Sequence, residues 1–304
     1  MLKNKIVDDT ETGIQISKPA DFVLNVIFII IAFACIYPLL LVFAVSFTDE
    51  TTLTNAGYSI LPTKLSLSAY AYILKNISAI GGAYAVSIFV TVIGSVIGLI
   101  VMALYAYPLS RDDFKYKGIF NVIIVITMLF SGGLVPMYMV YVKVLHLKNS
   151  LGALILLYLF SAFYVMIIRT FYKTNVSNSL IEAAQIDGAG EFLIFFKIVV
   201  PLAKPALATI MMFSMLVYWN DWYGPLLFIN DTKLYNLQYL MYTVQAKISN
   251  LSMIAKGGQI NLNDIPSETA RMALAIVAIG PIILAYPFFQ RYFEKGISLG
   301  ATKE

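Results

Sequence analysis

Long stretches without charge constrain this chain more than any other feature. Only 12% of its 304 residues are Asp, Glu, Lys or Arg. The charge-free runs are 22–48, 76–110, 118–142, 149–168 and 272–290, and a further run, 205–230, is interrupted only by Asp221. Crossing the hydrocarbon core of a membrane takes roughly 20 apolar residues, and a charge at its centre is costly. These runs lack the alternation of barrel strands, so the sequence predicts an all-α polytopic membrane protein.

The charged residues between the runs set the predicted topology. The six predicted transmembrane helices lie near residues 22–47, 81–107, 119–141, 150–171, 206–229 and 271–290. An even number of spans places both termini on one side of the membrane. Most of the 21 Lys and Arg residues fall on that side, and such residues favour the cytoplasm. We therefore expect a cytoplasmic segment 1–21, a transmembrane domain 22–290 and a cytoplasmic tail 291–304.

The first apolar run has a competing interpretation as a secretory signal peptide. Ala44, Val45 and Ser46 resemble a small-residue cleavage site. The run before them is much longer than the roughly 7–15 residues of a signal core, and acids such as Asp8 dilute the basic start. We interpret this run as a retained transmembrane helix.

The reactive side chains exclude several classes of site. Cys35 and His146 are the only residues of their types, so neither a disulfide nor a Cys/His zinc site is expected. No Gly-Lys pair occurs in the chain, which excludes a phosphate-binding P-loop. We expect no cofactor on this chain, and any ATP and Mg would be bound by a partner ATPase.

Two predicted outer segments are long. Residues 48–80 include LPTKLSLSAYAYILKN, which predicts a short helix capped by Ser66 or Ser68. Residues 230–270 are predicted to be a polar loop without an apolar core of its own. Loops of that length are usually disordered or form docking surfaces.

The cytoplasmic segment 173–205 has the most distinctive pattern. A serine before Leu180 is placed to cap a helix, Gly188 and Gly190 indicate a turn, and residues 191–200 predict a second, apolar helix that the following prolines end. Its composition suggests a socket for another protein, because small residues allow close approach and two acids flanking them can hold basic groups. These residues are Glu182, Ala183, Ala184, Asp187, Gly188, Ala189 and Gly190. Alternatively, the segment is a helix-turn-helix that packs on the bundle's own inner face.

The stretch EAAQIDGAGEFLIFFKIVVPLAKPAL resembles the EAA loop of ABC importer permeases. The matching positions are Glu182, Ala183, Ala184, Gly188, Ile198 and Pro201, with Asp187 before the glycine as in the sugar-importing branch. FSGGLVPMYMVYVKVLHLKNS, YWNDWYGPLLFINDTKLYNLQYL and YPFFQRYFEKGISLGATKE extend the likeness over residues 15–304. The chain thus resembles the multiple-sugar, maltose-permease-like branch, and within it the LplC/YtcP type of carbohydrate permeases.

This resemblance implies a type I ABC importer permease fold with a cytoplasmic coupling helix in the loop 173–205. The chain would form half of a translocation pore for oligosaccharides in a bacterial cell membrane. Its implied partners are a homologous second permease, two ATPase subunits that use ATP and Mg, and an extracellular lipid-anchored sugar-binding protein. The ATPase-coupling residues would be Glu182, Ala183, Ala184, Asp187, Gly188 and Ala189. Gly296, Gly300 and Lys303 in the tail would contact the ATPase dimer.

A possible sugar pathway lies in YWNDWYGP, which combines aromatic rings with polar groups in a predicted span. The candidate residues are Trp219, Asn220, Asp221, Trp222 and Tyr223. An ionisable residue within a membrane segment is a functional candidate by default. The competing interpretation is an aromatic belt at the membrane surface. The Ser-Gly-Gly at 131–133 is interpreted as a close-packing site, with a kink as the alternative.

Three classes of function are compatible with a helical membrane protein. An ABC importer permease accounts for both the loop and the tail. An ATP-independent secondary sugar transporter or channel would be expected to carry several carboxylates in its spans, and only Asp221 is available. A non-transporting membrane scaffold leaves the loop and the tail unexplained.

Overall fold

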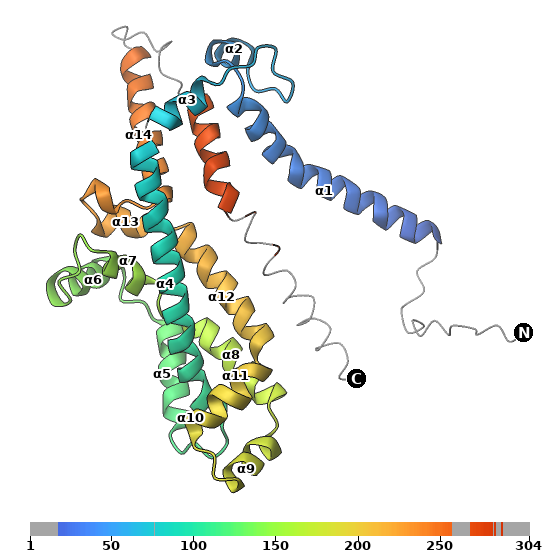
Figure 1. The fold of residues 1–304 in the computed structure, drawn as a ribbon, viewed down its shortest axis with the longest axis vertical. Helices are drawn as coiled ribbons and strands as arrows, with labels where there is room; N and C mark the ends of the chain where they lie inside the picture. The colour runs from blue at the N-terminus through green and yellow to red at the C-terminus, as the bar shows by residue number, and fades with distance from the viewer. Residues whose placement is uncertain (1–17, 76, 257–267, 282, 284–286, 288–304) are drawn as a thin grey trace, which may run out of the picture.

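The computed structural model describes residues 18–75, 77–256, 268–281, 283 and 287. Within these residues every extended regular element is a helix, and the only strand-like pairing is an isolated bridge between Thr48 and Leu65. The all-α prediction is confirmed. Figure 1 shows one long, central helix, α4, with shorter helices packed along it.

Seventeen elements are named along the described chain. They are α1 (Lys18–Ser46), α2 (Glu50–Ala56), α3 (Ser68–Lys75), α4 (Ile77–Ser110), α5 (Lys117–Leu129), α6 (Leu134–Met139), η1 (Val140–Val144), α7 (Leu151–Leu157), α8 (Ala162–Asn175), α9 (Asn178–Ile186), α10 (Glu191–Ile194), η2 (Phe195–Val199), α11 (Val200–Leu202), α12 (Lys204–Trp219), α13 (Tyr223–Phe228), η3 (Thr232–Leu234) and α14 (Leu237–Lys256). Residues 268–281 form a further helix. The turns η1 and η2 are π-helical, and η3 is a 3-10 turn.

The helix α4 packs against α12 and α8 and carries much of the core. Two glycines on it allow very close approach. A Cβ atom added at Gly94 would lie 2.5 Å from a ring carbon of Tyr218, and one at Gly98 would lie 2.7 Å from the carbonyl oxygen of Leu159. Neither position has room for a side chain, so both contacts depend on glycine.

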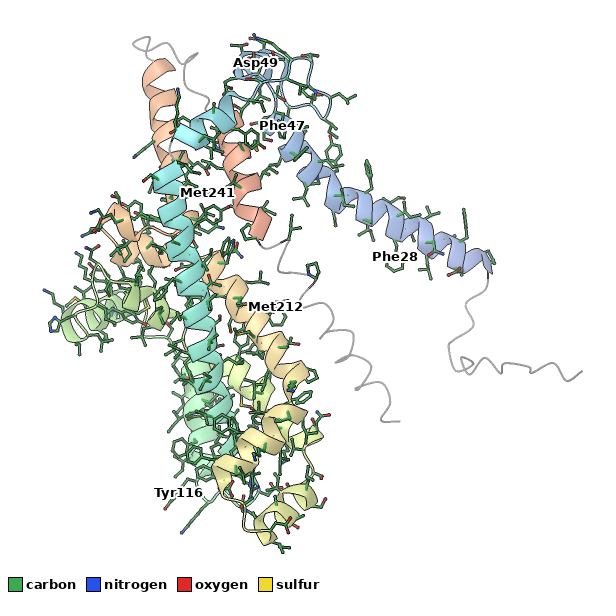
Figure 2. The ribbon with its side chains drawn as sticks, in the orientation of Figure 1. Phe28, Phe47, Asp49, Tyr116, Met212 and Met241 are labelled. Carbon is green, nitrogen blue, oxygen red and sulfur yellow. The ribbon has the colours of Figure 1, made fainter. Side chains whose placement is uncertain are left out.

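Two helices are long and apolar enough to cross a membrane alone, namely Pro19–Ser46 and Ile77–Ser110. Three bent helix pairs raise the possible number of spans to five among the described residues. The predicted last span, 271–290, is described only in part, so the count of six spans stays a prediction. The helix α1 is apolar on all sides and leaves the bundle; its Phe28 is 63% exposed (Figures 1 and 2). A helix of this kind needs lipid or another subunit around it.

The prediction of a continuous third span over 119–141 is wrong. The helix α5 ends at Leu129, and the chain bends by 111° before continuing as α6 and η1. The cause lies at the Ser-Gly-Gly site, because Gly133 has φ +85, a backbone conformation that favours glycine. A Cβ at Gly133 would meet nothing within 4 Å. Gly133 therefore lies in the bend and packs closely on no other part of the described chain, and the close-packing interpretation stays a prediction for contact with another subunit.

The fourth and fifth predicted spans are also interrupted. The span 150–171 breaks between α7 and α8 with a bend of 52°. The span 206–229 ends as a helix at Trp219, and α13 follows as a separate short helix. As predicted, the apolar helix that begins at Glu191 ends near the prolines, and an 81° bend separates it from α12.

The prediction of a coreless polar loop over 230–270 is wrong for its described part. The helix α14 spans 20 residues, and Leu237, Leu240, Met241 and Val244 pack in one apolar cluster with the helix 268–281. Their spacing of three, four and seven residues is that of one helix face. The segment is therefore an amphipathic helix.

The predicted short helix in the first outer segment is present as α3. The backbone N–H of Ser68 donates to Ser66 Oγ at 3.2 Å. Nearby, the Glu50 carboxylate at the start of α2 accepts from the backbone N–H groups of Glu268 and Thr269 at 3.0 Å. These bonds fix the outer segment to the first turn of the helix 268–281.

The glycine contacts of α4 generate a stability prediction. We expect Gly98→Ala to destabilise the protein by about 1–3 kcal/mol, because the new Cβ meets a backbone oxygen and forces the helices apart. Gly82→Ala, on the same helix, is the matched control, since a Cβ there meets nothing within 4 Å. Melting of the purified protein, followed by size-exclusion chromatography after heating, measures the difference. Equal melting temperatures for the two variants would show that the close approach is unimportant.

Candidate functional site

The predicted coupling segment forms a helix-turn-helix at one end of the molecule (Figure 1). The helix α9 ends because Gly188 adopts φ +82, the left-handed conformation that glycine tolerates best. The backbone N–H of Ala189 then donates to the carbonyl of Ala184 at 2.9 Å and closes the turn. A new helix begins at Glu191, whose carboxylate lies in its first turn, where negative charge is favourable.

The six predicted coupling residues divide between two faces of this segment. Glu182, Ala183, Asp187 and Gly188 are exposed, whereas Ala184 and Ala189 are half-buried and pack on the largest core cluster. Ile181 is buried and anchors α9 to the bundle. The structure therefore leaves one side of the segment free for contact with another molecule.

One exposed residue of this face was not predicted to be functional. The side chain of Ile186, which is not among the predicted coupling residues, is 86% exposed at the end of α9. It lies five residues after the buried Ile181, which at 100° per residue places it off the buried face. That helical offset was the signal in the sequence.

The helix after the turn confirms part of the alternative interpretation, in which the segment packs on the chain's own bundle. Ile194 and Phe195 are buried against the chain's own bundle. Phe192 and Phe196 are 75% and 57% exposed. The segment is thus both packed on the inner face and apolar on its outer side.

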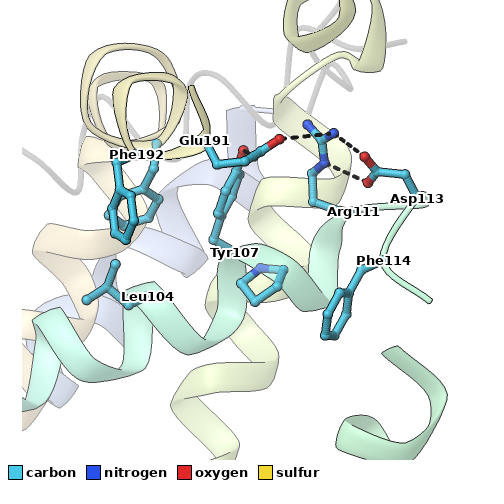
Figure 3. A pocket seen from close by; sticks show the side chains of 9 residues that line it. Leu104, Tyr107, Arg111, Asp113, Phe114, Glu191 and Phe192 are labelled. Atoms are coloured by element: carbon cyan, nitrogen blue, oxygen red, sulfur yellow. Dashed lines mark hydrogen bonds and ion pairs between the residues drawn. The ribbon is translucent and has the colours of Figure 1, made fainter. Parts of the chain in front are cut away.

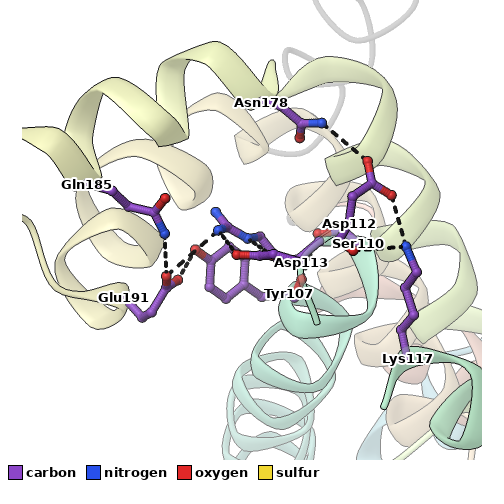
Figure 4. Close-up of polar contacts among 9 residues, drawn as sticks. Tyr107, Ser110, Asp112, Asp113, Lys117, Asn178, Gln185 and Glu191 are labelled. Atoms are coloured by element: carbon purple, nitrogen blue, oxygen red, sulfur yellow. Dashed lines mark hydrogen bonds and ion pairs between the residues drawn. The ribbon is translucent and has the colours of Figure 1, made fainter. Parts of the chain in front are cut away.

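A network of polar contacts lies between this segment and the end of α4 (Figures 3 and 4). Arg111 follows the last residue of α4, and its Nε atom donates to Asp113 Oδ1 at 2.8 Å. Its Nη2 atom lies 3.8 Å from Glu191 Oε1. Beside them is an apolar cavity of about 570 Å³, lined by Leu104, Tyr107, Pro108, Phe114, Phe192 and Phe195 together with the three charged residues.

The charges in the turn after α4 have perturbed acidities. Hydrogen bonds from Lys117 and then Asn178 lower the pKa of the Asp112 carboxyl. The hydrogen bond from Arg111 lowers the pKa of Asp113, and the same bond raises the pKa of Arg111. Because the folded-state pKa values of the carboxyls are depressed, their stabilising contacts are present at neutral pH and are lost as the pH falls through those values.

The five predicted pathway residues differ in their surroundings. Trp219 is buried and its Nε1 atom donates to the carbonyl of Ala278 at 3.3 Å. Asn220 is exposed, and its amide donates to the carbonyl of Leu216. Trp222 is 43% exposed and stacks on Tyr242, with ring centroids 4.9 Å apart. Tyr242 was missed, because α14 was interpreted as a loop.

Asp221 is only 6% exposed and has structural partners. Its Oδ1 atom accepts from the backbone N–H groups of Tyr223 and Gly224, at 3.1 and 2.8 Å, and from the Tyr158 hydroxyl at 3.0 Å. It therefore caps the first turn of α13 and ties it to the break between α7 and α8. Its role as a pathway residue stays a prediction.

Other candidate positions add no site. Gly296, Gly300 and Lys303 lie outside the described residues. His146 has φ +51, as suits a turn residue, and Cys35 is exposed on α1. Among the described residues there is no group of three or more potential metal ligands.

The fold and this loop define the class of protein. The structure is similar to a chain in the crystal structure of a bacterial ABC transporter involved in the import of the acidic polysaccharide alginate. The TM-score is 0.78 at 29% identity, and the match covers 90% of this chain and 96% of that one. The fold is therefore that of a type I ABC importer permease.

The family follows from the sequence matches. Residues 100–299 match the binding-protein-dependent transport system inner membrane component family, and the chain belongs to that family. It is 37% identical to the polygalacturonan/rhamnogalacturonan transport system permease protein YtcP of Bacillus subtilis, over 90% of this chain and 94% of the relative. It is 35% identical to protein LplC of the same species, over 88% and 89%. The chain is a multi-pass protein of the bacterial plasma membrane.

The contacts of Asp221 generate a prediction that distinguishes a structural role of this residue from a direct role in the sugar pathway. We expect Asp221→Ala to lower the free energy of unfolding by about 1–3 kcal/mol, because two backbone N–H groups and the Tyr158 hydroxyl lose their acceptor. Asp221→Asn keeps an acceptor oxygen and should cost less. Asn220→Ala, at the exposed neighbouring position, is the control. A variant Asp221→Ala with unchanged melting but impaired uptake would instead indicate a direct role in the pathway.

Proposed function

We propose that this chain is one permease subunit of an ATP-driven importer for oligosaccharides and that α9 receives the ATPase stroke. The observation that carries the proposal is the exposed face of Glu182, Ala183, Ile186 and Asp187 beside the Gly188 turn, within a family of transport permeases. The opposite side of α9 is anchored through Ile181. A force applied to the exposed face therefore acts on the bundle and not on a free loop.

The names of the relatives support a carbohydrate as the cargo. Two are permeases for polygalacturonan/rhamnogalacturonan and for arabinooligosaccharides, the latter AraQ of Halalkalibacterium halodurans. The structural neighbour belongs to an alginate importer. We assign oligosaccharides to this chain as a class.

The proposed assembly contains partners on both sides of the membrane. A homologous second permease completes the pore, and two ATPase subunits bind ATP and Mg on the cytoplasmic side. An extracellular lipid-anchored binding protein delivers the sugar. In this arrangement both termini are cytoplasmic, and the tail residues Gly296, Gly300 and Lys303 lie beside the ATPase subunits.

The proposed docking face makes a direct prediction. We expect Glu182→Lys to reduce the ATPase retained on the purified permease about tenfold, because a cation replaces the carboxylate that would hold basic groups of the partner. Asp21→Lys makes the same change of charge at an exposed position of α1, away from α9, and is the control. Co-purification and sugar-stimulated ATP hydrolysis are the measurements.

Two outcomes would contradict the proposal. Full ATPase retention and normal stimulated hydrolysis in Glu182→Lys would remove the role of this face. Sugar uptake into proteoliposomes that is driven by an ion gradient, with no ATPase present, would favour the secondary-transporter alternative.

A further inference from the structure

A single carboxylate joins the coupling segment to the cytoplasmic end of α4. Glu191 Oε2 accepts from the Tyr107 hydroxyl, on α4, at 2.6 Å. Glu191 Oε1 accepts from the Gln185 amide, on α9, at 2.9 Å and lies 3.8 Å from Arg111 Nη2. Figure 4 shows Tyr107, Gln185 and Glu191 converging from three different elements, and Figure 3 shows Arg111 beside Glu191. We call Tyr107, Arg111, Gln185 and Glu191 the inner clasp.

Arg111 is held firmly enough to act as a fixed point in this clasp. Its side chain is only 10% exposed, and its guanidinium donates to both oxygens of Asp113. A bidentate pair of this kind fixes the direction of the guanidinium as well as its position. The neighbouring residue Leu109 is bonded in turn, because its carbonyl accepts from Arg169 Nε on α8 at 3.1 Å.

A second contact fixes the other end of α9 to the same turn. Asp112 Oδ2 accepts from the amide of Asn178, the first residue of α9, at 3.2 Å. Asp112 Oδ1 accepts from Lys117 Nζ at 3.0 Å, at the start of α5. The turn 111–113 therefore contacts α9 at its first residue directly and near its last residue through Glu191.

Apolar packing also joins α4 to the helix after the Gly188 turn, since Tyr107, Ile194 and Phe195 belong to one buried cluster. The rings of Tyr107 and Phe195 are in contact, with centroids 5.3 Å apart, but the cavity of about 570 Å³ lies beside them (Figure 3). A gap in apolar packing removes contacts that would otherwise transmit displacement. Beside this cavity, the polar contacts of the inner clasp add a directional connection to the apolar one.

We propose that Arg111 and Glu191 are positioning residues that transmit the movement of the coupling segment to α4. The inference rests on the proposed function, since it requires an ATPase stroke. Displacement of α4 would then reach the Tyr218 ring, which lies against Gly94. It would also reach Leu159, between α7 and α8, whose carbonyl oxygen lies against Gly98. Uncoupling, and not loss of ATPase binding, is the expected result of breaking the clasp.

The first experiment measures uptake per ATP hydrolysed in the full complex in proteoliposomes. We expect Glu191→Ala to lower this ratio about tenfold, the scale of a typical coupling free energy. Glu191→Gln keeps an acceptor for Tyr107 and should give an intermediate ratio. Asp113 and the carboxylate of Glu191 are 61% and 54% exposed, so Arg111→Met leaves no buried, unpaired charge and should behave like Glu191→Ala. Retained ATPase and a complex that stays folded at the assay temperature are expected in each.

The control is Lys197→Gln, which removes an exposed charge from the same helical segment. It should leave the ratio unchanged. If the wild-type complex is active and both Glu191→Ala and Arg111→Met show a normal ratio of uptake to ATP hydrolysed, the proposed role of the inner clasp is overturned. Failure of the wild-type complex to couple uptake to ATP overturns the proposed function instead, so the two failures are distinguishable.

The second experiment restores the connection without its charges. Arg111→Cys and Glu191→Cys are combined in a Cys35→Ser background, and a reversible bifunctional thiol reagent of side-chain length is added. We expect low uptake per ATP before cross-linking, recovery towards the wild-type ratio afterwards and loss again on reduction. If cross-linking blocks transport in a complex that still hydrolyses ATP, the two groups must separate during the cycle, and a rigid connection is wrong.

Discussion

Exclusion of charge from the membrane interior determines where this protein can make ionic contacts. The ion pairs of the described chain lie in two groups: Asp49–Lys64 and Glu268–Arg271 near one end of α4, and the contacts of Arg111 and Lys117 just beyond its other end. Between these groups, helices meet through apolar side chains, close glycine contacts and hydrogen bonds such as that from Tyr158 to Asp221. Charge-assisted bonds are strong and directional, whereas apolar contacts permit sliding. The ion pairs of the described fold therefore add directional connections at its two ends.

The long helices could be predicted from the sequence because a membrane-spanning helix and a charge-free run cover nearly the same residues. The helix α1 follows from the charge-free run that ends before Asp49, and α4 follows from the run that ends before Arg111. The breaks within the third and fourth spans were not, because hydropathy does not change where a backbone bends. Gly133 offered a local signal, but only its φ angle distinguishes a kink from a packing site. The amphipathic period of α14 was visible in the sequence and was overlooked among polar residues.

Of the candidate site, the exposed face could be predicted from the sequence, and the contacts beneath it could not. The small residues and acids around Gly188 identify the exposed face, because a contact surface is built from residues close in the chain. The clasp beneath it joins Arg111 to Glu191, two residues far apart in sequence, and no local pattern relates them. Asp221 shows the reverse case, since a lone acid in an apolar run suggested a pathway, and the structure gives it a helix cap and a tyrosine partner.

The length of α4 explains why a connection at its Ser110 end matters for the far end. Its 34 residues extend about 50 Å at 1.5 Å per residue. A helix of that length is a continuous hydrogen-bonded rod, so it moves largely as one piece unless a kink interrupts it. Its one proline, Pro108, lies in the last turn, beside the clasp and below the glycine contacts. Movement that enters at Tyr107, on the Gly98 side of this proline, is thus passed to Gly98 and Gly94, where the neighbouring backbone and the Tyr218 ring leave no space to absorb it.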